Sequence, residues 1–91
     1  MSKVYSVTYD LKTPGRDYTP LYEALKKAGK WWHYLESTWL IATDETPNQL
    51  YNRLVSTITI SDRLLIIEVR NNGQGWLPKA AWDWIEENAP R

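Results

Sequence analysis

The sequence predicts an α+β fold of the ferredoxin-like type, in which a four-stranded antiparallel sheet carries two helices on one face. Three observations lead to this prediction. Residues 3–10 alternate as a strand does, with Tyr5, Val7 and Tyr9 on one side. Two later segments begin at a Thr-Pro pair and place apolar residues at helical spacing. The predicted elements follow the order β-α-β-β-α-β, and the two halves repeat the pattern of strand, Asp and Thr-Pro helix.

The first helix is predicted over residues 20–28. A Pro-Gly pair in the loop 12–17 fits a turn and ends the first strand. Thr19 is the candidate N-cap, because Pro20 then occupies the first helical position. Gly29 is expected to end the helix.

A hairpin and a second helix follow. Residues 31–35 and 38–43 are rich in aromatic and β-branched side chains, which favours two antiparallel strands. Thr46 and Gln49 have the spacing of a capping box and predict a helix over residues 47–57.

The fourth strand, residues 64–69, begins with an unbroken apolar run, which indicates a strand covered on both faces. Its outer face requires a cover, either the C-terminal tail or a second copy of the chain, and we expect a homodimer. The tail, residues 76–91, follows an Asn-Gly turn cluster and predicts a docked helix over residues 79–88.

Length and composition limit the classes of protein. The 91 residues fit one domain, predicted over 1–91 with its core in residues 3–70. There is no cysteine and no apolar run of membrane-spanning length, so disulfides, zinc-thiolate sites and a membrane partner are not expected. The start of the chain has no export signal pattern, and we expect a cytoplasmic protein.

Asp10 is the candidate catalytic and metal-binding residue. It ends the first strand and precedes a flexible loop, a position from which a carboxylate can bind Mg²⁺ or Mn²⁺. A single carboxylate is too few, but a dimer would supply a second Asp10, and a shared metal could then activate water for phosphodiester attack. The alternative is that Asp10 accepts hydrogen bonds from loop amides such as that of Lys12.

Basic and aromatic residues suggest a nucleic-acid or small-ligand site. The eleven basic and eleven acidic residues cancel, so such a site must be a local patch. The chain has six Trp and six Tyr but no Phe, more rings than a small core is expected to enclose, and we expect Trp31, Trp32 and Trp76 to be partly exposed. The candidate binding residues are Lys12, Arg16, Lys30, Trp31, Trp32 and His33. The alternatives are that Lys26, Lys27 and Lys30 are solvated lysines at a helix C-terminus and that His33 is a packed, hydrogen-bonded histidine.

Four features carry a resemblance to a known family: residues 4–10 (VYSVTYD), a helix ending at Gly29, residues 37–41 (STWLI) and residues 62–67 (DRLLII). They resemble the small CRISPR-associated ferredoxin-fold endoribonucleases, a structural group that also contains virulence-associated protein D toxins. The resemblance implies a homodimer whose sheets face each other and a metal site at Asp10.

Three functions remain open. The first is a small homodimeric adaptor that binds nucleic acid or protein, in phage defence or a mobile element. The second is a divalent-metal-dependent endonuclease or endoribonuclease that uses Asp10. The third is a small-nucleotide-binding protein. The adaptor is favoured because the net charge is zero and only Lys12 and Arg16 represent the basic stretch usual after the family's Asp.

Overall fold

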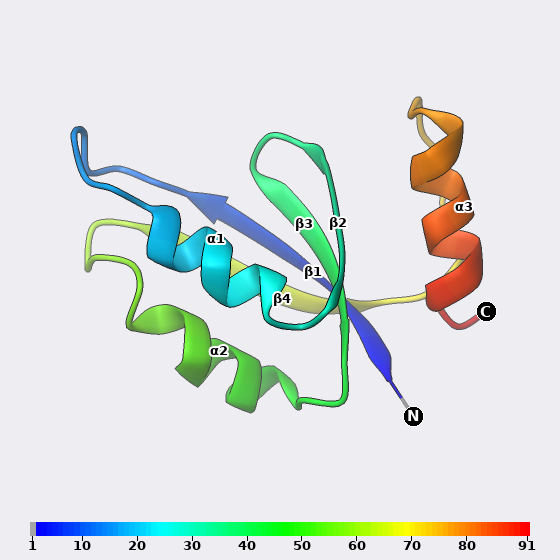
Figure 1. Ribbon diagram of the computed structural model, residues 1–91, viewed down its shortest axis with the longest axis horizontal. Helices are drawn as coiled ribbons and strands as arrows, with labels where there is room; N and C mark the ends of the chain where they lie inside the picture. The colour runs from blue at the N-terminus through cyan, green and yellow to red at the C-terminus, as the bar shows by residue number, and fades with distance from the viewer. Residues whose placement is uncertain (1) are drawn as a thin grey trace.

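The computed structural model describes residues 2–91, and Met1, the first residue of the predicted domain, lies outside the described residues. The chain forms an α+β structure (Figure 1). Its elements are β1 (Lys3–Asp10), α1 (Thr19–Lys26), β2 (Lys30–Leu35), β3 (Thr38–Thr43), α2 (Pro47–Val55), β4 (Arg63–Val69) and α3 (Lys79–Asn88). The four strands form one sheet in the order β2-β3-β1-β4, and all neighbouring strands are antiparallel.

Both sheet-covering helices are shorter than the sequence predicts. α1 ends at Lys26 because the amides of Ala28 and Gly29 turn back three residues, to the carbonyls of Leu25 and Lys26. Gly29 then takes the left-handed conformation, with φ +85°. α2 ends at Val55, and a similar tight turn continues the coil to Ile58.

One of the two predicted helix starts is confirmed and the other is wrong. The capping box at Thr46 and Gln49 is present: the Gln49 amide donates to the Thr46 hydroxyl (3.2 Å), and the Thr46 amide donates to the Gln49 side chain (2.8 Å). The prediction of Thr19 as an N-cap is wrong. Thr19 is the first residue of α1, and its amide donates to the carboxylate of Asp17 (2.9 Å).

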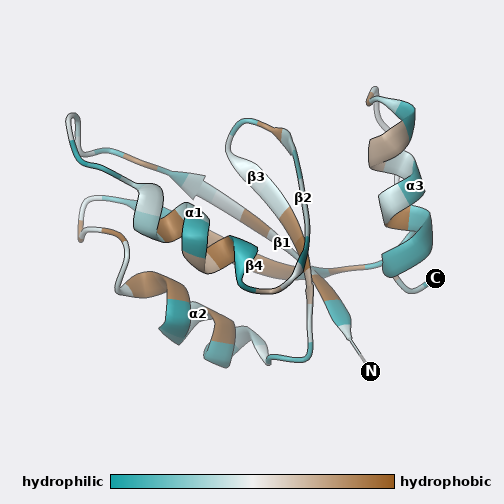
Figure 2. Cartoon of the chain, in the orientation of Figure 1, coloured by the Kyte–Doolittle hydropathy of each residue, from teal (hydrophilic) through white to brown (hydrophobic). Residues whose placement is uncertain are grey.

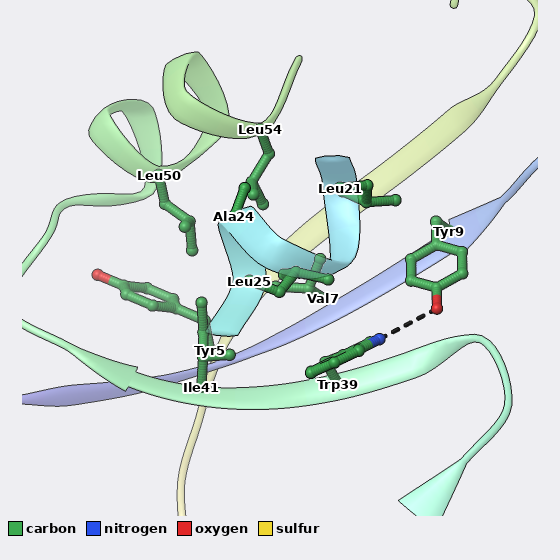
Figure 3. Packing of buried hydrophobic residues seen from close by; sticks show 10 residues of the cluster. All are labelled: Tyr5, Val7, Tyr9, Leu21, Ala24, Leu25, Trp39, Ile41, Leu50 and Leu54. Carbon is green, nitrogen blue, oxygen red and sulfur yellow. Dashed lines mark hydrogen bonds between the residues drawn. The ribbon is translucent and has the colours of Figure 1, made fainter. Parts of the chain in front are cut away.

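The main core lies between the sheet and helices α1 and α2 (Figures 2 and 3). From the sheet come Tyr5, Val7 and Tyr9 of β1 with Trp39 and Ile41 of β3. The helices contribute five buried residues of their apolar stripes: Leu21, Ala24, Leu25, Leu50 and Leu54. Tyr51, which the sequence places on the stripe of the second helix, is instead 46% exposed. Alternation in β1 therefore selects the side chains that face the helices.

The tail covers one end of the other face within the same chain, and in Figure 1 α3 lies apart from α1 and α2. Val4 and Ala42 pack there against Ala89, with Trp84 and Ile85 beside them. Of the two covers expected for this face of the sheet, the C-terminal tail and a second copy of the chain, the tail is present and covers part of the face.

The position of β4 corrects a sequence prediction. The apolar run of residues 64–69 indicated a strand covered on both faces, but β4 is an edge strand. Leu65 and Ile67, on the face away from α1 and α2, are 56% and 53% exposed. An apolar sequence shows that a strand tends to be buried. It does not show which strands lie beside it, because the neighbours depend on how the whole sheet is arranged.

Candidate ligand-binding site

Two of the predicted site residues, Asp10 and Lys30, lie at opposite ends of the sheet. Asp10 is the last residue of β1, whereas Lys30 pairs with Ala42, which in turn pairs with Val4 near the start of β1. Asp10 lies six residue steps beyond Val4 along β1, or roughly 20 Å at 3.3 Å per step. Asp10 and Lys30 therefore do not belong to one small-molecule site within a single chain.

Asp10 forms an ion pair with Lys12, with 2.9 Å between Oδ2 and Nζ, and more than half of each side chain is exposed. The expected hydrogen bond from the Lys12 amide does not go to Asp10, because that amide donates to Asp62 (2.7 Å). Arg16 lies further along the loop and donates to the carbonyl of Thr57 (3.4 Å). In the part of the chain that the structure describes, no three His, Asp or Glu residues gather as a possible metal site.

Asp62 is the buried carboxylate at this end, and the sequence reasoning missed it. It accepts hydrogen bonds from the Lys12 amide, from the Tyr18 hydroxyl (2.7 Å), and from both the amide and the hydroxyl of Thr59. Burial alone would raise the pKa of Asp62, but the hydrogen bonds outweigh it and lower the pKa to about 2. Asp62 thus fastens the loop after β1 to the turn before β4. Its position just before a strand was the only local signal.

Trp32 is buried, and Lys30 lies in a groove of its own. Trp32 is 3% exposed, and its indole nitrogen donates to the carbonyl of Ala81 in α3 (3.0 Å). The prediction that Trp32 is partly exposed is therefore wrong. Lys30 lines an open groove beside Asp44 and Glu45. Glu45 is held by Arg53 at 2.9 Å, an ion pair that lowers the pKa of the Glu45 carboxyl.

The remaining candidates, Trp31 and His33, meet in a hollow of about 460 Å³, which we call the aromatic recess. It lies on the helix side of the β2 edge. Its lining comes from β1, α1, β2, β3 and the β2–β3 turn: Tyr9, Tyr22, Lys26, Trp31, His33, Glu36 and Trp39.

Hydrogen bonds and ring stacking hold the floor of the aromatic recess together. Trp39 is buried, and its indole nitrogen donates to the Tyr9 hydroxyl (3.0 Å; Figure 3). That hydroxyl donates to the Glu36 carbonyl (3.3 Å), and burial raises the pKa of Tyr9. His33 stacks on Trp39 with ring centroids 4.0 Å apart and an angle of 13° between the rings. A hydrogen bond between His33 Nε2 and the Glu36 carbonyl (3.1 Å) holds the imidazole in this orientation.

The rim of the aromatic recess is exposed and charged. Trp31 is 40% exposed, and the Lys26 ammonium lies 5.5 Å from its ring centroid. Among residues 2–91, no carboxylate lies within ion-pair distance of Lys26. An aromatic face and an unpaired cation therefore stand side by side.

Sequence reasoning found Trp31 and His33 but missed the floor of the recess. Tyr9 lies on the helix-facing side of β1, and Tyr22 comes from α1, so only the tertiary structure brings them together. Lys26 was recognised only as part of a lysine cluster at the helix end. The alternation of β2 is the signal that separates Trp31 from Trp32, because neighbouring residues of a strand face opposite sides.

A scan against protein-family models, a search of curated proteins and a search of solved structures each find no match to this chain. The resemblance to the CRISPR-associated family stays a prediction. Within residues 2–91, no helix combines the length and the apolar character needed to cross a bilayer.

Proposed function

We propose that this chain is a noncatalytic binding module for single-stranded nucleic acid, with the aromatic recess as the binding site. The observation that carries the proposal is the half-exposed Trp31 ring with the Lys26 ammonium beside it. Proteins that bind single strands without sequence preference combine stacking rings with cations that follow the backbone.

The recess has room for a nucleobase. Its volume of about 460 Å³ lies within the range of small-molecule pockets. The exposed rings of His33 and Trp31 offer aromatic faces, and the Lys26 ammonium beside Trp31 is available to a phosphate of the same nucleotide. Glu36, an exposed acidic residue that also lines the recess, disfavours a long anionic contact surface. The proposal is therefore a short contact of one or two nucleotides.

We also infer that the fold is ferredoxin-like. The strand order β2-β3-β1-β4, the antiparallel pairing throughout and the two helices on one face support this inference. The homodimer expected from the sequence remains a prediction.

The nuclease alternative, with Asp10 as catalytic residue and Mg²⁺ or Mn²⁺ as cofactor, has weaker support. Asp10 is paired with Lys12, so a metal would have to displace the ammonium, and a second carboxylate would have to come from another copy. The residues of the aromatic recess supply no metal-binding pair of carboxylates, so binding there needs no divalent ion.

The test is the affinity for fluorescein-labelled oligothymidine and oligouridine, measured by anisotropy at low salt with EDTA present. Trp31→Ala should weaken binding by roughly 5- to 150-fold, because stacking on one base contributes about 1–3 kcal/mol. Trp76→Ala is the matched control, since Trp76 is 99% exposed and lies outside the recess. Lys26→Gln should reduce the slope of log affinity against log salt by about 0.7, the value for one phosphate contact on a single strand.

Three results would count against the proposal. They are no binding by the wild type, an equal loss in Trp31→Ala and Trp76→Ala, or binding that requires Mg²⁺. Cleavage of the oligonucleotides in Mg²⁺ or Mn²⁺ that is abolished in Asp10→Ala would instead support the nuclease.

A further inference from the structure

The β4 edge of the sheet is long, apolar and unpaired. β4 ends the strand order, and within residues 2–91 it pairs with β1 alone. Its centre, Leu64 to Ile67, carries no charge, and the flanking charged residues are Arg63 and Glu68. Proteins usually protect such an edge with an inward-pointing charge, a proline or a bulge, because it presents unsatisfied N–H and C=O groups to any other strand.

Exposed hydrophobic side chains gather around the same edge. Leu65 and Ile67 point away from α1 and α2, and each is more than half exposed. On the helix side, a groove of about 510 Å³ between α2 and β4 is lined by Tyr51 and Ile60, which are also exposed. Apolar surface therefore borders the unpaired backbone on both faces of the sheet.

We propose that a second copy of this chain occupies the β4 edge, by antiparallel pairing of β4 with β4 across a two-fold axis at Ile66. Ile66 is the middle residue of Arg63–Val69, so this register pairs the strand over its whole length. It places Leu65 opposite Ile67 of the second copy and joins the two sheets into one of eight strands. Interfaces of this kind use the same surface on both subunits.

The charges of β4 favour the antiparallel direction. Glu68 lies on the helix side of the sheet, opposite Tyr5 of β1, and Arg63 lies on the other face, opposite Asp10. In the antiparallel register Arg63 faces Val69 and Glu68 faces Leu64 of the second copy, whereas parallel pairing in register would set Arg63 beside Arg63 and Glu68 beside Glu68. The apolar opposition of Leu65 and Ile67 and the avoidance of like charges are properties of the strand paired with itself, so they point to a second copy. This pairing joins sheet edges, in contrast to the face-to-face dimer that the family resemblance implies.

The sheet provides a matched pair of variants. Leu35, Thr38, Thr8 and Leu65 form one row across the four strands, with Leu35 and Leu65 at its opposite ends and on the same face. Their exposures are similar, 48% for Leu35 and 56% for Leu65. Leu65→Lys and Leu35→Lys therefore make the same chemical change on the same face, one at the proposed interface and one at the far edge.

The experiment is sedimentation velocity on the wild type and both variants, without nucleic acid, over roughly 1–100 µM, the range in which weak dimers dissociate. We expect a wild-type dimer, a Leu35→Lys dimer of equal affinity, and a Leu65→Lys protein whose dimer affinity is lower by at least about 100-fold, because two lysines meet across the axis. Far-UV circular dichroism checks that both variants fold, which their exposed positions favour.

A monomeric wild type would overturn the proposal, and so would a Leu65→Lys protein that remains dimeric. Loss of the dimer in both variants would show face-to-face docking and would also overturn it. None of these measurements involves the aromatic recess, so their outcome is independent of the proposed nucleic-acid binding.

Discussion

Replacement of Trp32 by Phe tests whether this side chain anchors α3 or contacts a ligand. The substitution keeps an aromatic ring at a 3% exposed position but removes the indole N–H that donates to the Ala81 carbonyl. A lost hydrogen bond costs about 0.5–1.5 kcal/mol, and the smaller ring leaves a void that adds about 1 kcal/mol. The expected loss in the free energy of unfolding is thus roughly 1.5–2.5 kcal/mol.

The loss should be concentrated in α3. The other contacts of this helix are the packing of Trp84 and Ile85 on Val4 and Ala42 and a side-chain hydrogen bond from Asn71 to Glu86 (2.7 Å). Trp32 therefore supplies the hydrogen bond that joins the sheet directly to the first turn of α3. Thermal unfolding followed by circular dichroism should show a melting temperature lower by roughly 6–20 °C, at about 4–8 °C per kcal/mol for a domain of this size. Hydrogen exchange measured by mass spectrometry should accelerate in residues 79–88 before it does so in β1.

Trp76→Phe is the control for this experiment, because the same change at a 99% exposed residue should leave stability and exchange unaltered. The reasoning fails if Trp32→Phe leaves the melting temperature unchanged. It also fails if the variant loses oligonucleotide affinity while α3 exchanges at the wild-type rate, since Trp32 would then be a ligand contact.

Two further predictions concern stability. The pKa of Asp62 is about 2 in the folded chain and about 3.9 in an unfolded one, so its stabilising effect is complete above about pH 5 and declines as the pH falls towards 2. The urea midpoint of the wild type should therefore fall over this interval, and in Asp62→Ala it should be lower at pH 6 and change less with pH; an equal pH dependence in both proteins would contradict the assignment. Thr46→Ala removes the acceptor for the Gln49 amide and should cost about 1 kcal/mol. The neighbouring exposed site gives the control Asn48→Ala, and equal melting temperatures for the two variants would contradict the capping role.

The sequence predicts the elements of this fold well, because their signals are local. Alternation identifies β1 with its observed bounds, and the capping box identifies the start of α2. The edge position of β4 was not predicted, since an apolar run is compatible with a sandwiched strand and with an exposed edge. Placing it requires knowing that β1 pairs with both β3 and β4.

The candidate site was only partly predictable for the same reason. Trp31 and Trp32 differ because adjacent strand residues face opposite sides, which the sequence implies. The sequence does not imply that α3 covers the face of β2 that carries Trp32, because no local pattern predicts a hydrogen bond from Trp32 to the Ala81 carbonyl. The role of Asp62 was even less predictable from the sequence. Its hydrogen-bond donors come from Lys12, Tyr18 and Thr59, which converge only in the folded chain.

The two proposals use opposite edges of one sheet and are physically compatible. The aromatic recess lies at β2, and the proposed self-pairing edge is β4. A two-fold axis perpendicular to the sheet keeps the helix-bearing faces on the same side, so both recesses of a dimer would open towards one surface. Seven strand spacings of about 4.8 Å set the two β2 strands roughly 34 Å apart. A strand long enough to reach both recesses would then bind more tightly than a short one, because the second contact becomes intramolecular. This advantage of length should disappear in Leu65→Lys while the affinity for short oligonucleotides is retained, which separates the role of the β4 edge from that of the recess.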